Sequence, residues 1–157
     1  MKILVSACLL GENCKYSGDN NFCKKVTDLE NDYKIPGAHP AELIPVCPEV
    51  LGGLPIPRKP CEIVLDEVKT DDGVSYTAEY KKGAAKALKI ALEKNVDFAI
   101  LKSRSPSCGK GYIYDGTFSH TLTKGNGIFA QLLIENGIKI FTEEEIEKLG
   151  GQDGLQN

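Results

Sequence analysis

The stretch Phe98-Ala-Ile-Leu-Lys-Ser-Arg-Ser-Pro-Ser-Cys-Gly109 passes from an apolar run to hydroxyls, a thiol and a turn. This change is typical of a buried strand that ends at the carboxyl edge of a parallel sheet. In open α/β folds, ligands bind at that edge. The stretch therefore predicts a strand at 96–102 and a functional site directly after it.

Two other stretches have the same form. Ile3-Leu-Val-Ser-Ala-Cys8 and Leu43-Ile-Pro-Val-Cys-Pro-Glu49 each pass from an apolar run to a cysteine. The carboxyl ends of parallel strands meet at one edge of the sheet. We therefore expect Cys8, Cys47 and Cys108 to bring three thiols to one place.

The rest of the chain alternates strand and helix patterns. This favours an α/β fold: a single-domain, Rossmann-like open sheet, mostly parallel, with helices on both faces and a small β-hairpin. Strands are expected at 2–5, 43–46, 96–102 and 138–141, and helices at 20–32, 80–95, 128–135 and 142–149. The hairpin is predicted from 61–68 and 75–77 across a turn at 71–73, and a second polar ribbon from 110–114 and 117–122.

Glycine and proline mark the irregular parts of the chain. Segment 47–60 is rich in both, so we expect it to form a long loop without regular structure, of the kind that is usually functional. A turn is expected at 35–40. The domain is predicted to span 1–149, and 150–157 to form a flexible C-terminal tail.

The composition is that of an ordinary globular protein. The 157 residues are 41% hydrophobic and 26% charged, with a formal net charge of −3. The chain lacks the basic surplus of a nucleic-acid-binding protein, so it gives no strong nucleic-acid signal. No apolar run approaches the ~20 residues of a transmembrane helix, and the apolar N-terminus is too short for a secretory signal. We expect a cytoplasmic protein with no membrane partner.

The sequence has six cysteines but only two histidines, His39 and His120. In a cytoplasmic protein, such a count favours metal, cluster or catalytic use over disulfides. Thiolate ligands favour zinc or iron–sulfur over oxygen-ligated metals. Cys23 and Cys61 fit ordinary free cysteines best. The residues alone leave open a shared metal or cluster site, a nucleophilic cysteine and a structural zinc site.

Three motifs make the chain similar to a known family. They are Ser6-Ala-Cys-Leu-Leu-Gly-Glu-Asn-Cys-Lys-Tyr-Ser-Gly18, Cys47-Pro-Glu-Val-Leu-Gly-Gly-Leu-Pro-Ile-Pro-Arg58 and Lys102-Ser-Arg-Ser-Pro-Ser-Cys-Gly109. Together they closely resemble the signature blocks of the TudS-like thiouracil desulfidases. The resemblance covers about residues 1–148, and the second and third blocks are specific in combination.

The resemblance implies a 4Fe–4S cluster that is held by three cysteines and has one iron without a protein ligand. Carried over to this sequence, the ligands are Cys8, Cys47 and Cys108, with Cys14 of the first block in reserve. The implied substrate is a small thiolated uracil, as a 2-thio or 4-thio base or nucleotide. The implied reaction is C–S bond cleavage by non-redox hydrolysis, in which water attacks the carbon that carries the sulfur.

Such a step needs a proton donor and acceptor. We expect Glu49 in this role because it lies two residues after Cys47. The alternative is a loop carboxylate that caps a helix or pairs with Arg58 or Lys59. Ser103, directly after its strand, is the expected partner that orients the water or the base.

Lys102 and Ser105 are the expected substrate-binding residues. The alternative for Lys102 is an ordinary lysine at a strand end, and serines before a proline often serve turn geometry alone. Gly125-Asn126-Gly127 precedes a helix, so its amides could face an anion, but a glycine turn alone is weak evidence and a plain loop is the favoured interpretation. The rival functions are a persulfide-forming cysteine enzyme without a cluster and a non-catalytic protein with structural zinc.

Overall fold

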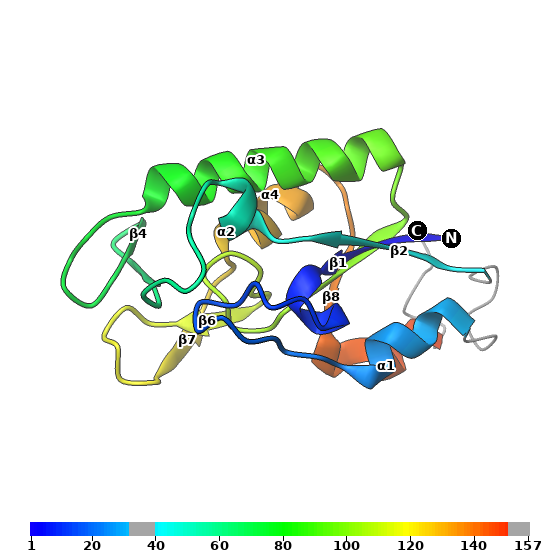
Figure 1. Ribbon diagram of the computed structural model, residues 1–157, viewed down its shortest axis with the longest axis horizontal. Coiled ribbons are helices and arrows are strands. Elements are labelled where there is room, and N and C mark those ends of the chain that lie inside the picture. The colour runs from blue at the N-terminus through cyan, green and yellow to red at the C-terminus, as the bar shows by residue number, and fades with distance from the viewer. Residues whose placement is uncertain (32–39, 151–157) are drawn as a thin grey trace.

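Four parallel strands form the centre of the protein (Figure 1). The structure is a computed structural model that describes residues 1–31 and 40–150. The strands lie in the order β2-β1-β5-β8. Their bounds are Lys2–Ser6 for β1, Glu42–Val46 for β2, Phe98–Leu101 for β5 and Ile140–Thr142 for β8.

Strand β1 pairs with β2 on one side and with β5 on the other. The chain therefore reverses its direction of travel across the sheet at β1. In open α/β sheets, the crevice outside the carboxyl ends at such a switch point is where ligands bind. Of the predicted thiols, Cys8 follows β1, Cys47 follows β2 and Cys108 lies in the loop after β5.

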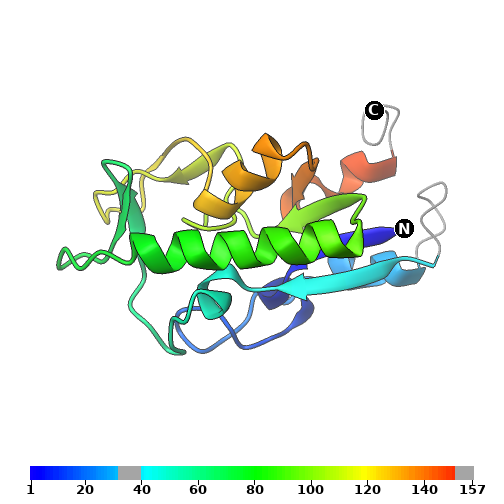
Figure 2. The same ribbon diagram turned by 90° about the horizontal axis from the view of Figure 1, so that it is seen from above.

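Two helices cover one face of the sheet, α3 (Thr77–Lys94) and α4 (Ile128–Glu135) (Figure 2). Helix α3 turns small apolar residues toward the strands, and α4 contributes larger ones. These side chains are buried against alternate residues of the strands: Ala84, Ala87, Ala91, Phe129 and Leu133 from the helices, and Leu4, Ile44, Ala99 and Leu101 from the sheet.

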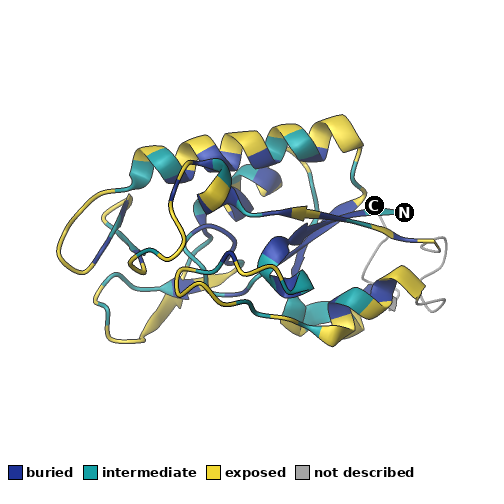
Figure 3. Cartoon of the chain, in the orientation of Figure 1, coloured by how far each residue is buried: buried dark blue, intermediate teal, exposed yellow. Residues whose placement is uncertain are grey.

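Short helices cover the other face, as the pattern of buried residues in Figure 3 illustrates. They are the 3₁₀ helices η1 (Ala7–Leu10), η2 (Asp28–Asn31) and η3 (Glu143–Gly150), with α1 (Lys24–Thr27). The core on this face is formed by Ile3, Val5, Phe98, Ile100 and Phe141 from the sheet, and by Leu9, Val26, Leu29 and Leu149 from the helices. The predicted open parallel sheet with helices on both faces is thereby confirmed.

Two small hairpins lie at the carboxyl end of the sheet (Figure 1). They are β3–β4 (Glu62–Val64 with Glu67–Lys69) and β6–β7 (Tyr112–Tyr114 with Leu122–Lys124). The predicted turn at 71–73 is present, but the pairing of 61–68 with 75–77 is confirmed only at its end, where the Tyr76 N–H donates to the Val68 carbonyl at 2.8 Å beside a bridge between Lys69 and Ser75. The chain turns earlier as well, at Leu65 and Asp66, which both have positive φ, as a type I′ hairpin turn requires.

Segment 47–60 also differs from the prediction, because it contains one helical turn, α2 (Pro48–Leu51). Proline is favoured at the first position of a helix, since its missing N–H has no partner to lose there. The other differences are small. The predicted helix at 20–32 is shortened to α1 and η2, and α3 starts earlier than expected. The predicted turn at 35–40 falls almost wholly outside the described residues, as does the tail after residue 150.

Helix α2 lies unusually close to α3 because two glycines face each other. A Cβ atom at Gly83 would lie 1.7 Å from the carbonyl oxygen of Pro48. A Cβ atom at Gly52 would lie 2.1 Å from the carbonyl oxygen of Glu79. Any side chain at either position would therefore move α2, which begins directly after Cys47 and carries Glu49.

Within the described part of the chain, no helix is long and apolar enough to cross a membrane.

Replacing Gly83 with alanine should destabilise the protein, although the same change inside an exposed helix stabilises by about 0.5–1 kcal/mol. The overlap with α2 reverses the sign, and we expect a loss of about 1–3 kcal/mol in the free energy of unfolding, as overpacking typically costs. Urea denaturation measures it. Ala85→Gly, at an exposed position of α3, is the control and should lose about 1 kcal/mol through helix propensity alone. A Gly83→Ala protein more stable than wild type would contradict the close packing.

Candidate functional site

The Cys8 thiol lies within electrostatic range of the two other predicted thiols, those of Cys47 and Cys108. Burial raises the pKa of the Cys8 thiol, a hydrogen bond with Asn21 lowers it, and the nearby Cys47 and Glu49 raise it further. Burial likewise raises the pKa of Cys108, and Glu49 and Cys8 add to the effect. The fold thus brings together the thiols that the sequence placed after three different strands.

Cys14 is a fourth thiol at the same place. Its thiol accepts a hydrogen bond from Cys47, which lowers the pKa of Cys14 and raises that of Cys47. Cys47 Sγ also lies 3.9 Å from the Cys14 carbonyl oxygen and 3.5 Å from Glu49 Oε2. Both thiols line a groove of about 350 Å³ beside the edge strand β2. Cys14 is therefore part of the site.

The donor set fits an iron–sulfur cluster. All six cysteines are free thiols, and thiolates are the usual ligands of such clusters. Burial disfavours the ionised form of Cys8 and Cys108, so thiolates here need a cationic partner. Within residues 1–31 and 40–150, no group of three or more His, Cys, Asp or Glu side chains is arranged to hold a single metal ion.

Glu49 lies on the first turn of α2 with only 9% of its surface exposed. Its carboxylate faces the Cys47 thiol. The two cations that sequence reasoning offered as partners make other contacts. Arg58 donates to a backbone carbonyl of the loop after β1 at 2.9 Å, and Lys59 pairs with Asp72 at 2.9 Å. The site thus holds a buried carboxylate beside a thiol.

The loop after β5 is held by its own serine and by helix α4. Ser105 Oγ accepts the backbone N–H groups of Ser107 at 3.1 Å and Cys108 at 3.0 Å. The hydroxyl oxygen of Ser105 therefore stabilises the turn that carries Cys108, which is the alternative given above for a serine directly before a proline.

Helix α4 starts against this loop. The N–H groups of Ile128 and Phe129 donate to the carbonyls of Pro106 and Ser107, each at 2.9 Å. Gly127 donates to Gly109 at 2.7 Å. The first amides of α4 are thus used by the loop, which favours the plain-loop interpretation of 125–127 over an anion site.

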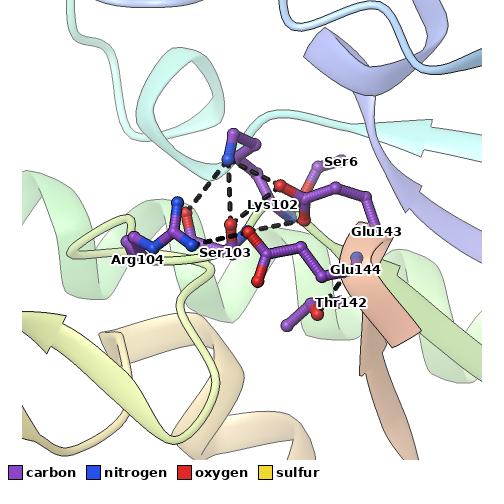
Figure 4. Close-up of polar contacts among 7 residues, drawn as sticks. All are labelled: Ser6, Lys102, Ser103, Arg104, Thr142, Glu143 and Glu144. Atoms are coloured by element: carbon purple, nitrogen blue, oxygen red, sulfur yellow. Dashed lines mark hydrogen bonds and ion pairs between the residues drawn. The ribbon is translucent and has the colours of Figure 1, made fainter.

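Lys102, Ser103 and Glu143 form a compact network at the ends of β5 and β8 (Figure 4). Lys102 Nζ lies 2.6 Å from Glu143 Oε1, and Ser103 Oγ donates to the same oxygen at 2.8 Å. The backbone N–H of Ser103 donates to Glu143 Oε2 at 2.8 Å. Ser6, at the end of β1, accepts the backbone N–H of Lys102 at 2.9 Å. The network therefore joins the ends of β1, β5 and β8.

The network is charged at neutral pH. Burial by itself raises the pKa of Glu143, but Lys102 and both donors of Ser103 lower it by more, so the pKa lies below its usual value. The Lys102 ammonium also lowers the pKa of Cys8, which places this cation near the thiols.

Sequence reasoning missed Glu143, Ser6, Asn21 and Tyr80. The glutamates at 143–145 fall inside the predicted helix at 142–149, and nothing in the local pattern indicates their partners, which lie some 40 residues away. Tyr80 is buried, and this burial raises the pKa of its hydroxyl, with smaller contributions from Glu49 and Cys61. The helical spacing around Tyr80 did not indicate such a contact. The remaining histidine in the described region, His120, is exposed and packs edge-on against Tyr114, while His39 lies outside that region.

A family model described as 2-thiouracil desulfurase matches residues 3–145. The chain belongs to this family. The match confirms the resemblance that the three sequence motifs carry.

Two proteins similar to this 2-thiouracil desulfurase family member extend the comparison. A solved structure described as "[4Fe-4S]-dependent thiouracil desulfidase TudS" is 39% identical, has a TM-score of 0.83 and covers 94% of each chain. The uncharacterized protein YbbK of Bacillus subtilis (strain 168) is 38% identical over 94% of this chain and 99% of that protein. Both likenesses extend over nearly the whole chain.

The Glu143 contacts predict a pH-dependent contribution to stability. Because folding lowers the pKa of Glu143, its contribution is full above the unfolded pKa of about 4.3 and is lost as the pH falls through the lower folded value. Glu143→Gln should therefore cost about 1–3 kcal/mol at pH 7, since it leaves buried partners unpaired. The difference from wild type should vanish at low pH. Urea denaturation across pH 2–7 measures it, and a difference independent of pH would contradict the ionic origin.

Proposed function

We propose that this protein is an iron–sulfur-dependent thiouracil desulfidase that hydrolyses the C–S bond of a small thiolated uracil. The observation that supports this best is the meeting of Cys8, Cys47 and Cys108 at the switch point of the sheet. The solved relative, described as [4Fe-4S]-dependent, has the cofactor that the sequence motifs imply. The family description names thiouracil as the substrate class.

In this proposal, Cys8, Cys47 and Cys108 hold the cluster. Cys8 and Cys47 follow β1 and β2 within two residues, and Cys108 lies in the loop after β5, so three segments far apart in the sequence each supply one ligand. When bound, the cluster supplies an iron without a protein ligand, which acts as a Lewis acid with affinity for sulfur. Cys14 remains the reserve ligand because its thiol contacts that of Cys47.

The chain's own residues handle the water and the protons. Glu49, buried beside Cys47, takes the proton of the attacking water and later returns it to the product side. Ser103 orients the water at the carbon that carries the sulfur. Overall, C=S and H₂O become C=O and H₂S: the oxygen comes from water, the sulfur leaves with two protons, and no electrons are exchanged.

Lys102 and Ser105 are the proposed contacts to the base. The Lys102 side chain is 26% exposed although it is paired with Glu143, and its ammonium lies near enough to Cys8 to lower the pKa of that thiol, which supports a contact to a carbonyl oxygen of the base. Ser105 Oγ accepts two backbone N–H groups, and its hydroxyl proton remains available to donate a hydrogen bond to the base. The substrate is proposed to be a free base or nucleotide, in either the 2-thio or the 4-thio form.

The ligand assignment predicts which cysteines retain iron. Protein prepared without oxygen should be brown, with several irons per chain, and Cys47→Ser should lose most of that iron. Cys23→Ser is the matched control, because Cys23 is a free thiol at the start of α1 and lies outside the three sequence motifs, and it should keep wild-type iron. Full iron in Cys47→Ser would refute the assignment. A colourless wild-type protein that still desulfurises thiouracil would support the persulfide-forming alternative, and one zinc per chain without activity would support the structural-zinc alternative.

The acid–base role of Glu49 predicts a large loss of activity without loss of the cofactor. Glu49→Gln should lower the turnover of 2-thiouracil and 4-thiouracil by about 10²–10⁴-fold, the usual contribution of general acid–base catalysis. Its iron content should match wild type. Glu42→Gln, at an exposed position of β2, should leave turnover within about 2-fold, as expected for a surface change. Turnover of Glu49→Gln at the wild-type rate would exclude the role.

A further inference from the structure

Three consecutive glutamates at the start of η3 each pair with a cation of the loop after β5. The pairs are Glu143 with Lys102 at 2.6 Å, Glu144 with Arg104 at 2.6 Å, and Glu145 with Lys110 at 3.0 Å. This loop carries Ser103 and Cys108. Strand β8 and η3, at the far edge of the sheet, are therefore tied to the proposed active site by charge.

The three pairs differ in how exposed their side chains are and in what else they contact. The Arg104–Glu144 side chains are 42% and 54% exposed, and such surface pairs contribute little. The Lys102–Glu143 side chains are only 26% and 13% exposed. Glu143 is also the glutamate that accepts both the backbone N–H and the hydroxyl of Ser103. Its position is thus tied to a residue of the proposed chemistry.

The contacts of Ser103 determine which way its hydroxyl points. A serine hydroxyl has one proton to donate and two lone pairs that accept. The proton goes to Glu143 Oε1 at 2.8 Å, and one lone pair accepts from Lys102 Nζ at 3.0 Å. Among the described residues, nothing else bonds to Ser103 Oγ, so its second lone pair is free to accept from a water molecule. Ser103 can therefore interact with a water molecule only by accepting a hydrogen bond from the O–H of that water.

Lys102 keeps this arrangement in place. Because its ammonium helps to lower the pKa of Glu143, the carboxylate stays ionised and remains an acceptor. A carboxylate with a lowered pKa is a poor base, so it holds the serine proton without removing it. A positioning role for Glu143 is thus favoured over a proton-relay role.

We propose that Glu143 is a positioning residue, which fixes the Ser103 hydroxyl so that its free lone pair accepts a hydrogen bond from the attacking water. This inference rests on the proposed desulfidase function. The proposal adds Glu143, which follows the strand farthest from β2, to the residues that act in that function. It also assigns Ser103 the role of a hydrogen-bond acceptor.

The test is a double-mutant cycle on the iron-loaded protein, with 2-thiouracil as substrate. Glu143→Gln should lower kcat by roughly 10–100-fold, a loss typical of a misplaced catalytic group, and should change KM by less than about 3-fold. Glu143→Asp should recover part of the loss. Glu144→Gln, the neighbouring ion pair on the same helix, is the matched control and should stay within about 2-fold of wild type.

The cycle separates positioning from a merely structural role. Ser103→Ala should lower kcat about as much as Glu143→Gln, and the double variant should be no slower than Ser103→Ala alone, because Glu143 acts through that hydroxyl. A structural role would give the same fold loss from Glu143→Gln in both backgrounds. Iron content and thermal unfolding temperature are measured on every variant. Equal iron with a lowered kcat supports positioning, and loss of iron in Glu143→Gln overturns it.

Two further outcomes are informative. If Glu143→Gln does not fold, the pair Lys102→Met with Glu143→Gln removes both charges together, and its kcat with and without Ser103→Ala gives the same comparison. If wild type is active and either Glu143→Gln or Ser103→Ala keeps wild-type kcat, the inference is wrong while the proposed function stands. If wild type with full iron has no desulfidase activity, the proposed function itself fails.

Discussion

The parallel pairing of β1 with β2 on one side and β5 on the other is the constraint on which the site depends. Because side by side parallel strands end at one edge, residues after three of them arrive at the same crevice. A hydrogen bond from the Lys102 backbone N–H to the Ser6 side-chain Oγ then joins the ends of β5 and β1 at this edge. The thiols of Cys8, Cys47 and Cys108 meet because the sheet brings their strands together, although they lie far apart in the sequence.

Close packing and charge fix the side chains that the sheet only brings near. The facing glycines at 52 and 83 let α2 sit against α3, and α2 holds Glu49 beside Cys47. On the opposite side, the glutamates of η3 hold the loop after β5 by ion pairs. The site is thus bordered on one side by the α2–α3 packing, which depends on the absence of side chains at two glycines. On the other side it is bordered by the ion pairs of η3, which depend on charged side chains. The first is insensitive to salt and pH, whereas the second titrates with Glu143.

Much of this organisation follows from sequence pattern, and the exceptions have physical causes. Apolar runs that end in cysteine predicted the sheet and the thiols, because burial and strand direction are local properties. Helix α2 was missed since prolines usually mark irregular chain, yet Pro48 stands at the one helical position that tolerates it. Glu143 was missed because its partners are distant in sequence. For Ser105, the turn role that the sequence offered as an alternative is present, because its hydroxyl oxygen accepts two backbone N–H groups.

The start of α4 has a consequence for local unfolding. Its first N–H groups donate to the carbonyls of residues 106, 107 and 109, the segment that carries Cys108. A Cβ atom at Gly127 would lie 2.4 Å from the Ser107 carbonyl, so the helix and the loop touch backbone to backbone. The first turn of α4 and the loop therefore open and close as one cooperative unit. Amide hydrogen exchange at Ile128 and Phe129 would then follow the same opening that exposes Cys108, which makes the helix a reporter on the site.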